Sequence, residues 1–251
     1  MIKRVVLFLI SVVIFSNAEA QENSGGGIDD ETLHFGFNFQ FVNSEYKIFK
    51  KSNWRDPYYE LTKANPFDPN EKELVKDSLY AIGSVISPGF GFGSVAELKL
   101  GSNLNLRLTP SLIFIDRLLD YEYASPDDTK RRIVQSAVFE LPLGFKFKSD
   151  RKKNFRAYVL GGGKYSIDIS SKKKNGDEGF IKAEQLVKNK RNILWYEVGV
   201  GLEIYFEYFK MSPEIKISNS VGDVLRHEDH PYAAPIDKLL LHNIHFSLFF
   251  E

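Results

Sequence analysis

The chain has 251 residues, 33 Lys and Arg against 33 Asp and Glu, 21 phenylalanines and no cysteine. The length allows one large domain or two small ones. The balanced charge gives no field that would attract nucleic acid, so we expect no nucleic-acid partner. Without cysteine there are no disulfides, thiolate metal sites or cysteine nucleophiles, and no acylated cysteine of the kind that anchors a bacterial lipoprotein.

The first twenty residues have the form of a secretory signal peptide. Lys3 and Arg4 precede an apolar stretch, and Ala18-Glu19-Ala20 has the A-x-A form of a cleavage site. The apolar stretch, over 5–15, is shorter than the about 20 residues of a membrane-spanning helix, which disfavours the alternative of an uncleaved anchor. We expect a signal peptide over 1–20, a flexible N-terminal segment over 21–31 and the folded domain over 32–251.

Apolar and polar residues alternate along eight stretches of the mature chain. In the first, Leu33 and four phenylalanines occupy the odd positions, and His34, Gly36, Asn38 and Gln40 occupy the even ones. A period of two is typical of a β-strand with one apolar face. The eight stretches are 33–41, 90–100, 104–114, 139–147, 155–169, 194–206, 211–217 and 240–250.

Strand length and loop length favour a membrane barrel over a soluble sandwich or a lipocalin-like barrel. Several stretches alternate for longer than the about 5–6 residues of an average strand, and a tilted membrane strand needs about 9–11. Short connections at 101–103, 149–153 and 208–210 contrast with long polar ones at 43–83, 118–132, 170–191 and 219–235. This asymmetry is typical of outer-membrane barrels. We predict an all-β fold, an eight-stranded antiparallel up-and-down transmembrane β-barrel in the outer membrane, with extracellular long loops and periplasmic termini.

The polar face of these strands carries charges that a barrel would enclose. In lipid, strands satisfy every backbone group only in a closed barrel, and eight strands leave a lumen just wide enough for side chains. We therefore expect paired charges to fill the lumen, with inner-face glycines making room and no conducting pore. The expected network is Glu97, Arg107, Glu140, Arg156, Lys164, Glu197 and Glu203, accompanied by Lys99, Lys146, Glu214 and Lys216.

Other residues carry weaker expectations. Trp195, Tyr205 and Tyr208 lie near strand ends and suit aromatic girdles, and Asp116 with Arg117 is expected to form an ion pair at the rim. The basic run at 171–175 is a candidate for contact with lipopolysaccharide phosphates.

No motif predicts a catalytic residue, a cofactor or a metal. His227 and His230 are three residues apart in RHEDHPY, a spacing that suits a metal on a helical turn, but solvated side chains are the simpler interpretation in a polar loop. His34 and His245 fall on inward faces, as lumen or rim residues. Lys164 ends a GGGK run that lacks the following helix and the Ser or Thr of a phosphate-binding loop.

The first long loop mixes aromatic and charged side chains. Trp54, Arg55, Tyr58 and Tyr59 suit a protein contact. A lid folded over the mouth of the barrel is the alternative interpretation. Residues 70–73 are expected to open a short helix towards Tyr80.

Three ordered segments resemble the PorT family of small outer-membrane barrels, over residues 33 to about 165. The distinctive pieces are HFGF at 34–37, Pro-Gly-Phe at 88–90, Asp-Arg at 116–117 and ELPL at 140–143. The resemblance implies an accessory, non-enzymatic component of the type IX secretion system, which exports folded cargo and supports gliding motility. The implied partners are outer-membrane lipid, lipopolysaccharide and other secretion components. A generic small barrel that acts in adhesion or as a lipid-modifying enzyme is the alternative.

Overall fold

The computed structural model describes residues 31–61, 72–124, 130–170 and 182–251. The predicted signal peptide and almost all of the predicted flexible segment lie outside these residues. No helix among them is long and apolar enough to span a membrane. The elements are β1 (Leu33–Lys50), β2 (Tyr58–Leu61), β3 (Lys72–Lys76), β4 (Leu79–Val85), β5 (Ser87–Lys99), β6 (Leu104–Leu108), β7 (Ser111–Tyr123), β8 (Lys130–Lys148), β9 (Phe155–Asp168), the 3-10 turn η3 (Lys182–Glu184), β10 (Asn192–Tyr205), β11 (Lys210–Ser220) and β12 (Ile236–Phe250).

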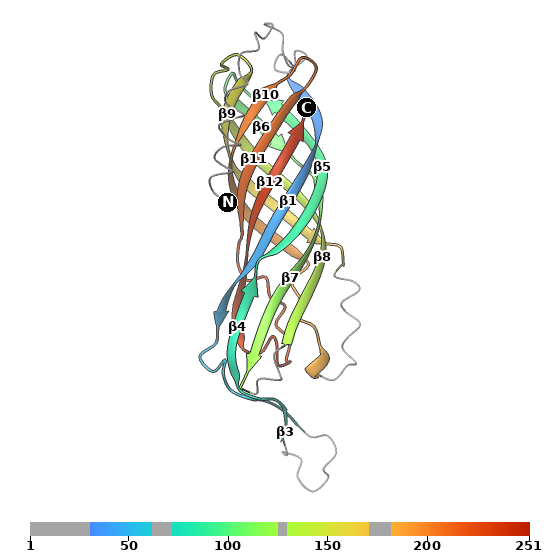
Figure 1. The fold of residues 1–251 in the computed structure, drawn as a ribbon, viewed down its shortest axis with the longest axis vertical. Helices are drawn as coiled ribbons and strands as arrows, with labels where there is room; N and C mark the ends of the chain where they lie inside the picture. The colour runs from blue at the N-terminus through green and yellow to red at the C-terminus, as the bar shows by residue number, and fades with distance from the viewer. Residues whose placement is uncertain (1–30, 62–71, 125–129, 171–181) are drawn as a thin grey trace, which may run out of the picture.

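Antiparallel pairing closes the long strands into a ring (Figure 1). β1 pairs with β12 on one edge, with Phe37 opposite Phe250, and with β5 on the other, with Phe39 opposite Phe92. β4 and β5 follow one another along the same wall, as do β6 and β7. When each of these is counted as one interrupted strand, the ring of described residues contains eight strands. The predicted eight-stranded antiparallel barrel is confirmed.

The two interruptions have different causes. Pro110 has no N–H to donate and separates β6 from β7, while its carbonyl still accepts from Ser94 N at 3.0 Å. Around Ile86, Val85 lies opposite Leu118 and Phe90 lies opposite Phe114. Between these two pairs, the β4–β5 wall advances five residues while β7 advances four. The extra residue is a β-bulge, which bends the wall locally.

At the long-loop end, the strands run further than the alternation predicted. β1 continues to Lys50, β7 reaches Tyr123 and β8 begins at Lys130, so much of the predicted loops at 43–83 and 118–132 is strand. The helix expected from 70–73 is wrong over its described part, because Lys72–Lys76 is β3 and forms a hairpin with β2. In Figure 1 the end of β12 and the short turns are at the top, and β3 is at the bottom.

The faces that carry apolar and polar side chains change places along the barrel. In the part we call the apolar band, outward side chains such as Phe39, Phe90 and Val200 are apolar and exposed, and most inward ones are polar. In the distal extension, built by the long-loop ends of β1, β4, β7, β8 and β12, the inward side chains are apolar. Together with side chains of β10 and of the long loops, they form one buried cluster of Tyr46, Leu79, Ile82, Leu119, Tyr121, Tyr123, Val134, Val187, Ile193, Trp195, Val224, Leu225, Tyr232, Ile236, Leu239 and Leu241.

Candidate functional site

Arg107 organises the lumen at the short-turn end. Its Nη2 lies 2.8 Å from Glu97 Oε2, directly across the β5–β6 pair, where opposite charges stabilise a sheet. Its Nη1 donates to Glu214 Oε2 at 3.0 Å and its Nη2 donates to Glu251 Oε1 at 3.2 Å. All four side chains are buried. Because β6 and β11 stand on opposite sides of the ring, these bonds cross the lumen from wall to wall.

Two lysines join the same layer. Lys146 on β8 donates to Glu97 on β5 at 3.0 Å and also to Glu203 on β10. Lys210 lies 2.7 Å from Glu251. Charges from most of the ring therefore meet in one buried network, which fills the cross-section of the barrel.

An inner-face glycine makes room for this layer. A Cβ on Gly201 would clash with the ring of Tyr158, which lies across the strand pair. The Tyr158 hydroxyl donates to Glu214 at 2.9 Å. Gly201 thus lets a large side chain reach the network centred on Arg107.

A second layer of charge pairs lies towards the middle of the barrel. Lys164 Nζ is 2.9 Å from Glu140, and Lys216 Nζ is 3.0 Å from Glu197. The ring of His245 lies beside Lys164, with 3.5 Å between His245 Nε2 and the lysine Nζ. This layer is also buried, so the lumen is closed at two levels.

The structure places the predicted lumen residues as follows. Arg156 is partly exposed at the rim, with its Nη1 3.9 Å from Glu203, and Lys99 is half-buried at the end of β5. Lys210 and Glu251 belong to the network but were not predicted, because both lay outside the alternating stretches. Extending the alternating stretches 211–217 and 240–250 by one residue, to 210 and 251, would have placed both side chains on the inward face. The others are buried on the inner face: Glu97, Arg107, Glu140, Lys146, Lys164, Glu197, Glu203, Glu214 and Lys216.

Segments of the long loops fold into the distal mouth and close it. Leu225 and Tyr232 are fully buried in the apolar cluster. Tyr121 donates from its hydroxyl to the carbonyl of Tyr232 at 2.7 Å, and Asn189 Nδ2 donates to the hydroxyl of Tyr46 at 2.7 Å. Burial raises the pKa of Tyr121 well above its ordinary value. This end of the barrel is therefore closed largely by apolar packing.

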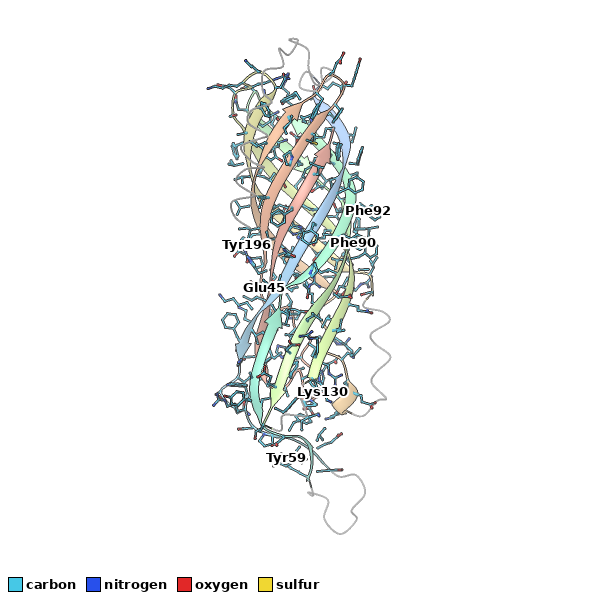
Figure 2. The ribbon with its side chains drawn as sticks, in the orientation of Figure 1. Glu45, Tyr59, Phe90, Phe92, Lys130 and Tyr196 are labelled. Carbon is cyan, nitrogen blue, oxygen red and sulfur yellow. The ribbon has the colours of Figure 1, made fainter. Side chains whose placement is uncertain are left out.

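The four residues predicted for partner contact do not share one environment. Trp54 is half-buried and packs against the apolar cluster. Two cations lie over its ring, with Lys50 Nζ 4.1 Å and Arg55 Cζ 5.0 Å from the ring centre. Tyr58 donates to Asp229 at 3.0 Å. Tyr59 is exposed, and Figure 2 shows it at the distal tip of the described chain.

Lys182 completes the contact that holds Tyr58. Its Nζ donates to Asp229 Oδ2 at 2.8 Å and to the Tyr58 hydroxyl at 3.2 Å. The hydrogen bond from Lys182 lowers the pKa of Asp229, and the same bond raises the pKa of Lys182. Burial raises the pKa of Tyr58.

The histidines do not form a metal site with one another. His227 bonds to Asp223 at 2.8 Å on the surface, and His230 is buried in the distal mouth. Among the described residues, one group of three possible ligands comes together, His34 with Glu97 and Glu251. Arg107 and Lys210 already donate to those carboxylates, so the group is part of the ion-pair network.

Three weaker expectations are wrong for geometric reasons. Asp116 points outward and Arg117 inward, because neighbours on a strand face opposite sides, and Arg117 donates instead to Ser44 at 3.2 Å and to Ser136 at 3.1 Å. Trp195 and Tyr205 are buried inside the barrel and belong to no girdle. Of the three aromatic residues, only Tyr208 is exposed.

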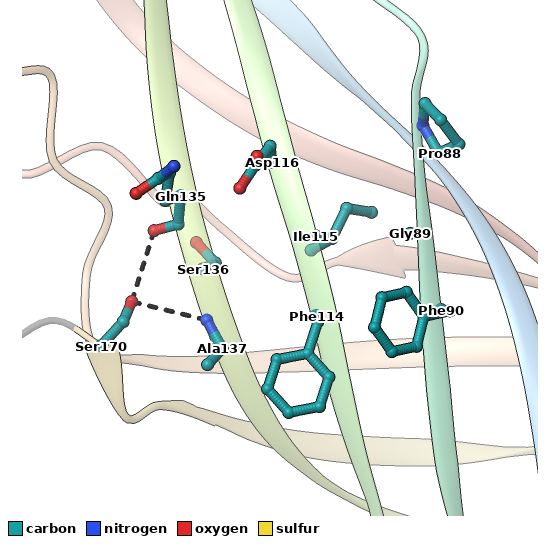
Figure 3. A pocket seen from close by; sticks show the side chains of 10 residues that line it. All are labelled: Pro88, Gly89, Phe90, Phe114, Ile115, Asp116, Gln135, Ser136, Ala137 and Ser170. Atoms are coloured by element: carbon teal, nitrogen blue, oxygen red, sulfur yellow. Dashed lines mark hydrogen bonds between the residues drawn. The ribbon is translucent and has the colours of Figure 1, made fainter.

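Two grooves indent the outer wall near the boundary between the apolar band and the distal extension. The first, of about 380 Å³, has an apolar part at Phe90 and Phe114 and a polar part at Asp116, Gln135 and Ser170 (Figure 3). Ser170 Oγ donates to the carbonyl of Gln135 at 3.3 Å and accepts from the amide of Ala137 at 3.5 Å. The second, of about 430 Å³, lies across β10, β11, β12 and β1.

Comparison with known proteins identifies the family. The family described as "Outer membrane protein beta-barrel domain" matches residues 20–226, and the chain belongs to it. The protein is therefore an outer-membrane β-barrel. No curated protein matches the sequence.

Three solved structures are similar in fold. The outer membrane protein OprG from Pseudomonas aeruginosa is 10% identical, with 86% of this chain and 93% of that chain covered and a TM-score of 0.41. Ail, the attachment invasion locus protein of Yersinia pestis, is 10% identical, with 88% and 98% covered and a TM-score of 0.33. The outer membrane protease OmpT from Escherichia coli is 9% identical, with 87% and 94% covered and a TM-score of 0.32.

Proposed function

We propose that this outer-membrane barrel is a non-enzymatic accessory component of the type IX protein secretion system, needed for export of cargo across the outer membrane. The observation that carries the proposal is the wall-to-wall network of Arg107, Glu97, Glu214 and Glu251. A lumen filled in this way has no room for a folded protein, so the barrel acts through its surfaces. The link to this particular machine rests on the resemblance over residues 33 to about 165.

The surface best equipped for a partner is the distal hairpin of β2 and β3. Tyr59 and Leu74 are exposed on it, and Tyr80 is exposed on the adjoining β4. Exposed aromatic and aliphatic side chains of this kind are typical of the centre of a protein interface. In this proposal, Trp54 and Tyr58 hold the hairpin against the barrel while Tyr59 and Leu74 face the partner. The proposed orientation places this hairpin outside the cell and both termini in the periplasm.

Deletion of the gene tests the proposal directly. We expect type IX cargo to accumulate in the periplasm with its sorting domain uncleaved, while other outer-membrane proteins assemble normally. Normal cargo release from the deletion strain would refute the secretion role. If attachment to surfaces or the structure of lipid A changed instead, the adhesion or lipid-modifying alternative would replace it.

A double variant, Tyr59→Ala with Leu74→Ala, tests the hairpin as the contact surface. We expect it to reproduce the secretion defect while the barrel still shifts its mobility on unboiled gels. Tyr208→Ala is the matched control, because it removes an exposed tyrosine at the short-turn end. A defect from Tyr208→Ala alone would move the contact to the opposite rim.

The absence of natural cysteine permits a clean test of orientation. Single variants Tyr59→Cys and Lys152→Cys place a thiol at the distal hairpin and at a short turn. A membrane-impermeant maleimide on intact cells should label the first and not the second. The reverse pattern would invert the barrel.

A further inference from the structure

The second wall groove lies at the edge of the apolar band. Strand register sets Tyr196, Asn219, His242 and Glu45 in one outward row across β10, β11, β12 and β1. In Figure 2, Tyr196 and Glu45 lie between the level of Phe92 and that of Lys130. The neighbouring rows on the side of the apolar band are Val198, Ile217, Ile244 and Asn43, followed by Val200, Ile215, Phe246 and Phe41. The groove is therefore polar on one side and continuous with a lipid-facing surface on the other.

The polar side of the groove offers donors and acceptors. A ring nitrogen of His242 bonds to Asn219 Oδ1 at 2.7 Å, which leaves the amide nitrogen of Asn219 pointing away from that bond. Glu45 lies opposite His242 across the β1–β12 pair and contributes carboxylate oxygens. Neutral and charged acceptors beside the amide donor of Asn219 suit the hydroxyl and amide groups of a sugar.

Two lysines stand on the distal side of this row. Lys47 lies opposite Leu240, and Lys238 lies opposite Phe49. Both ammonium groups are near the exposed ring of Phe49, at 5.6 Å and 6.0 Å from its centre. Among the residues that the structure describes, no carboxylate pairs with either lysine. Two cations beside the same ring at a membrane boundary, neither paired with a described carboxylate, are complementary to a phosphate.

We propose that this groove binds the phosphorylated sugar headgroup of an outer-leaflet glycolipid. The phosphate lies at Lys47 and Lys238, the sugar contacts Asn219, His242 and Glu45, and the acyl chains follow the apolar rows of the band. The proposal rests on the proposed orientation, in which the long-loop end is outside. The first groove offers a contrast, because its polar part holds Asp116, Gln135 and Ser170 and no cation among its lining residues.

The test measures lipid binding to the full-length mature barrel, purified and folded in mild detergent, by mass spectrometry of the intact complex. The probes are diphosphoryl lipid A, dephosphorylated lipid A and phosphatidylglycerol. We expect the barrel to prefer diphosphoryl lipid A. The double variant Lys47→Gln with Lys238→Gln should weaken its binding by about 30-fold, the size expected for two lysines near an anionic headgroup. The matched control, Lys152→Gln with Lys153→Gln, removes the same charge at a short turn and should bind as the native barrel does.

Two results would overturn the proposal. One is equal binding of diphosphoryl lipid A to the lysine variant and the native barrel. The other is equal binding of phosphatidylglycerol and diphosphoryl lipid A to the native barrel, since the groove would then recognise charge without the sugar. The single variant Lys238→Gln should show part of the loss of diphosphoryl lipid A binding. Its mobility on unboiled gels shows whether the barrel is still folded. Because this experiment uses neither cargo nor cells, its failure and a failure of the secretion proposal are independent.

Discussion

The apolar band and the distal extension place opposite chemistry on the two faces of the same strands. On β7, Phe114 faces outward in the band and Ser111 faces inward, whereas beyond Arg117 Asp120 and Glu122 face outward and Tyr121 and Tyr123 face inward. The alternation continues without a break, and only its polarity reverses. The environment outside the wall decides the polarity, because lipid excludes charge and water favours it.

The interior follows from the same reasoning. Where lipid surrounds the wall, burying an apolar side chain in the lumen gains little over leaving it in hydrocarbon. Paired charges such as Glu97 with Arg107 can therefore occupy the lumen, where each contact has a defined partner. Where water surrounds the wall, the hydrophobic effect stabilises an apolar interior such as the cluster around Leu119.

Breaking the lumen network should have the largest effect. Arg107→Leu leaves three buried carboxylates without their shared partner, and we expect a loss of about 3–5 kcal/mol in the free energy of unfolding. Urea unfolding of the barrel in lipid vesicles measures it. The control is Arg131→Leu, which removes the exposed bidentate bridge to Asp120 and should change the free energy of unfolding far less, because solvent screens an exposed ion pair. Equal losses would mean that the lumen is wet.

Shortening a leucine in the distal extension should have the next largest effect. Leu119 is fully buried, so Leu119→Ala should cost about 2–5 kcal/mol through lost burial and the cavity that remains. Leu202→Ala in the apolar band should cost about 2 kcal/mol or less, because lipid chains fill the space. The same unfolding measurement compares the two, and a reversed order would contradict the assignment of the two regions.

A charge added to the outward face of the wall should destabilise the apolar band more than the distal extension. Val200→Arg in the apolar band should cost about 2–4 kcal/mol if it lies at the midplane. Ile133→Arg, at an outward and similarly exposed position of the distal extension, should change stability by about 0.5 kcal/mol or less. Similar costs at both positions would place the membrane boundary beyond Ile133.

The pH dependence of the hairpin contact should be the smallest effect. The pKa of Asp229 is lowered by Lys182, so the contact is fully formed above the ordinary aspartate pKa of about 3.9 and is lost as pH falls through the lowered value. As an exposed ion pair it should contribute about 1 kcal/mol at most. NMR titration of the Tyr58 ring should show this midpoint.

Lys182→Gln provides the check on that assignment. Without the ammonium group, the midpoint seen at Tyr58 should move up towards 3.9, the value for an unperturbed aspartate. Asp237→Asn, which removes an exposed carboxylate elsewhere in the distal extension, should leave it unchanged. An unchanged midpoint in Lys182→Gln would mean that another group controls Asp229.

The errors in the sequence analysis cluster in the distal extension. There the apolar positions face inward, and stretches such as 46–50 and 130–132 lack the phenylalanine alternation of the band, so the sequence predicts them as loop. The buried positions of Trp195 and Tyr232 depend on which segments enter the mouth of the barrel. That choice is made by packing between residues far apart in the chain, and no local pattern records it.

Alternation by itself determined the strands of the apolar band, the even strand number and the inward face that carries Glu97, Arg107, Glu140 and Lys164, because side chains on a strand must alternate between two environments. Only the tertiary structure decided which charges meet. Arg107 reaches Glu214 and Glu251 across the ring, and Lys47 and Lys238 come together through pairing of the first and last strands. Ring closure and strand register set these distances. Both depend on hydrogen bonds between strands that are far apart in the sequence, such as β1 and β12.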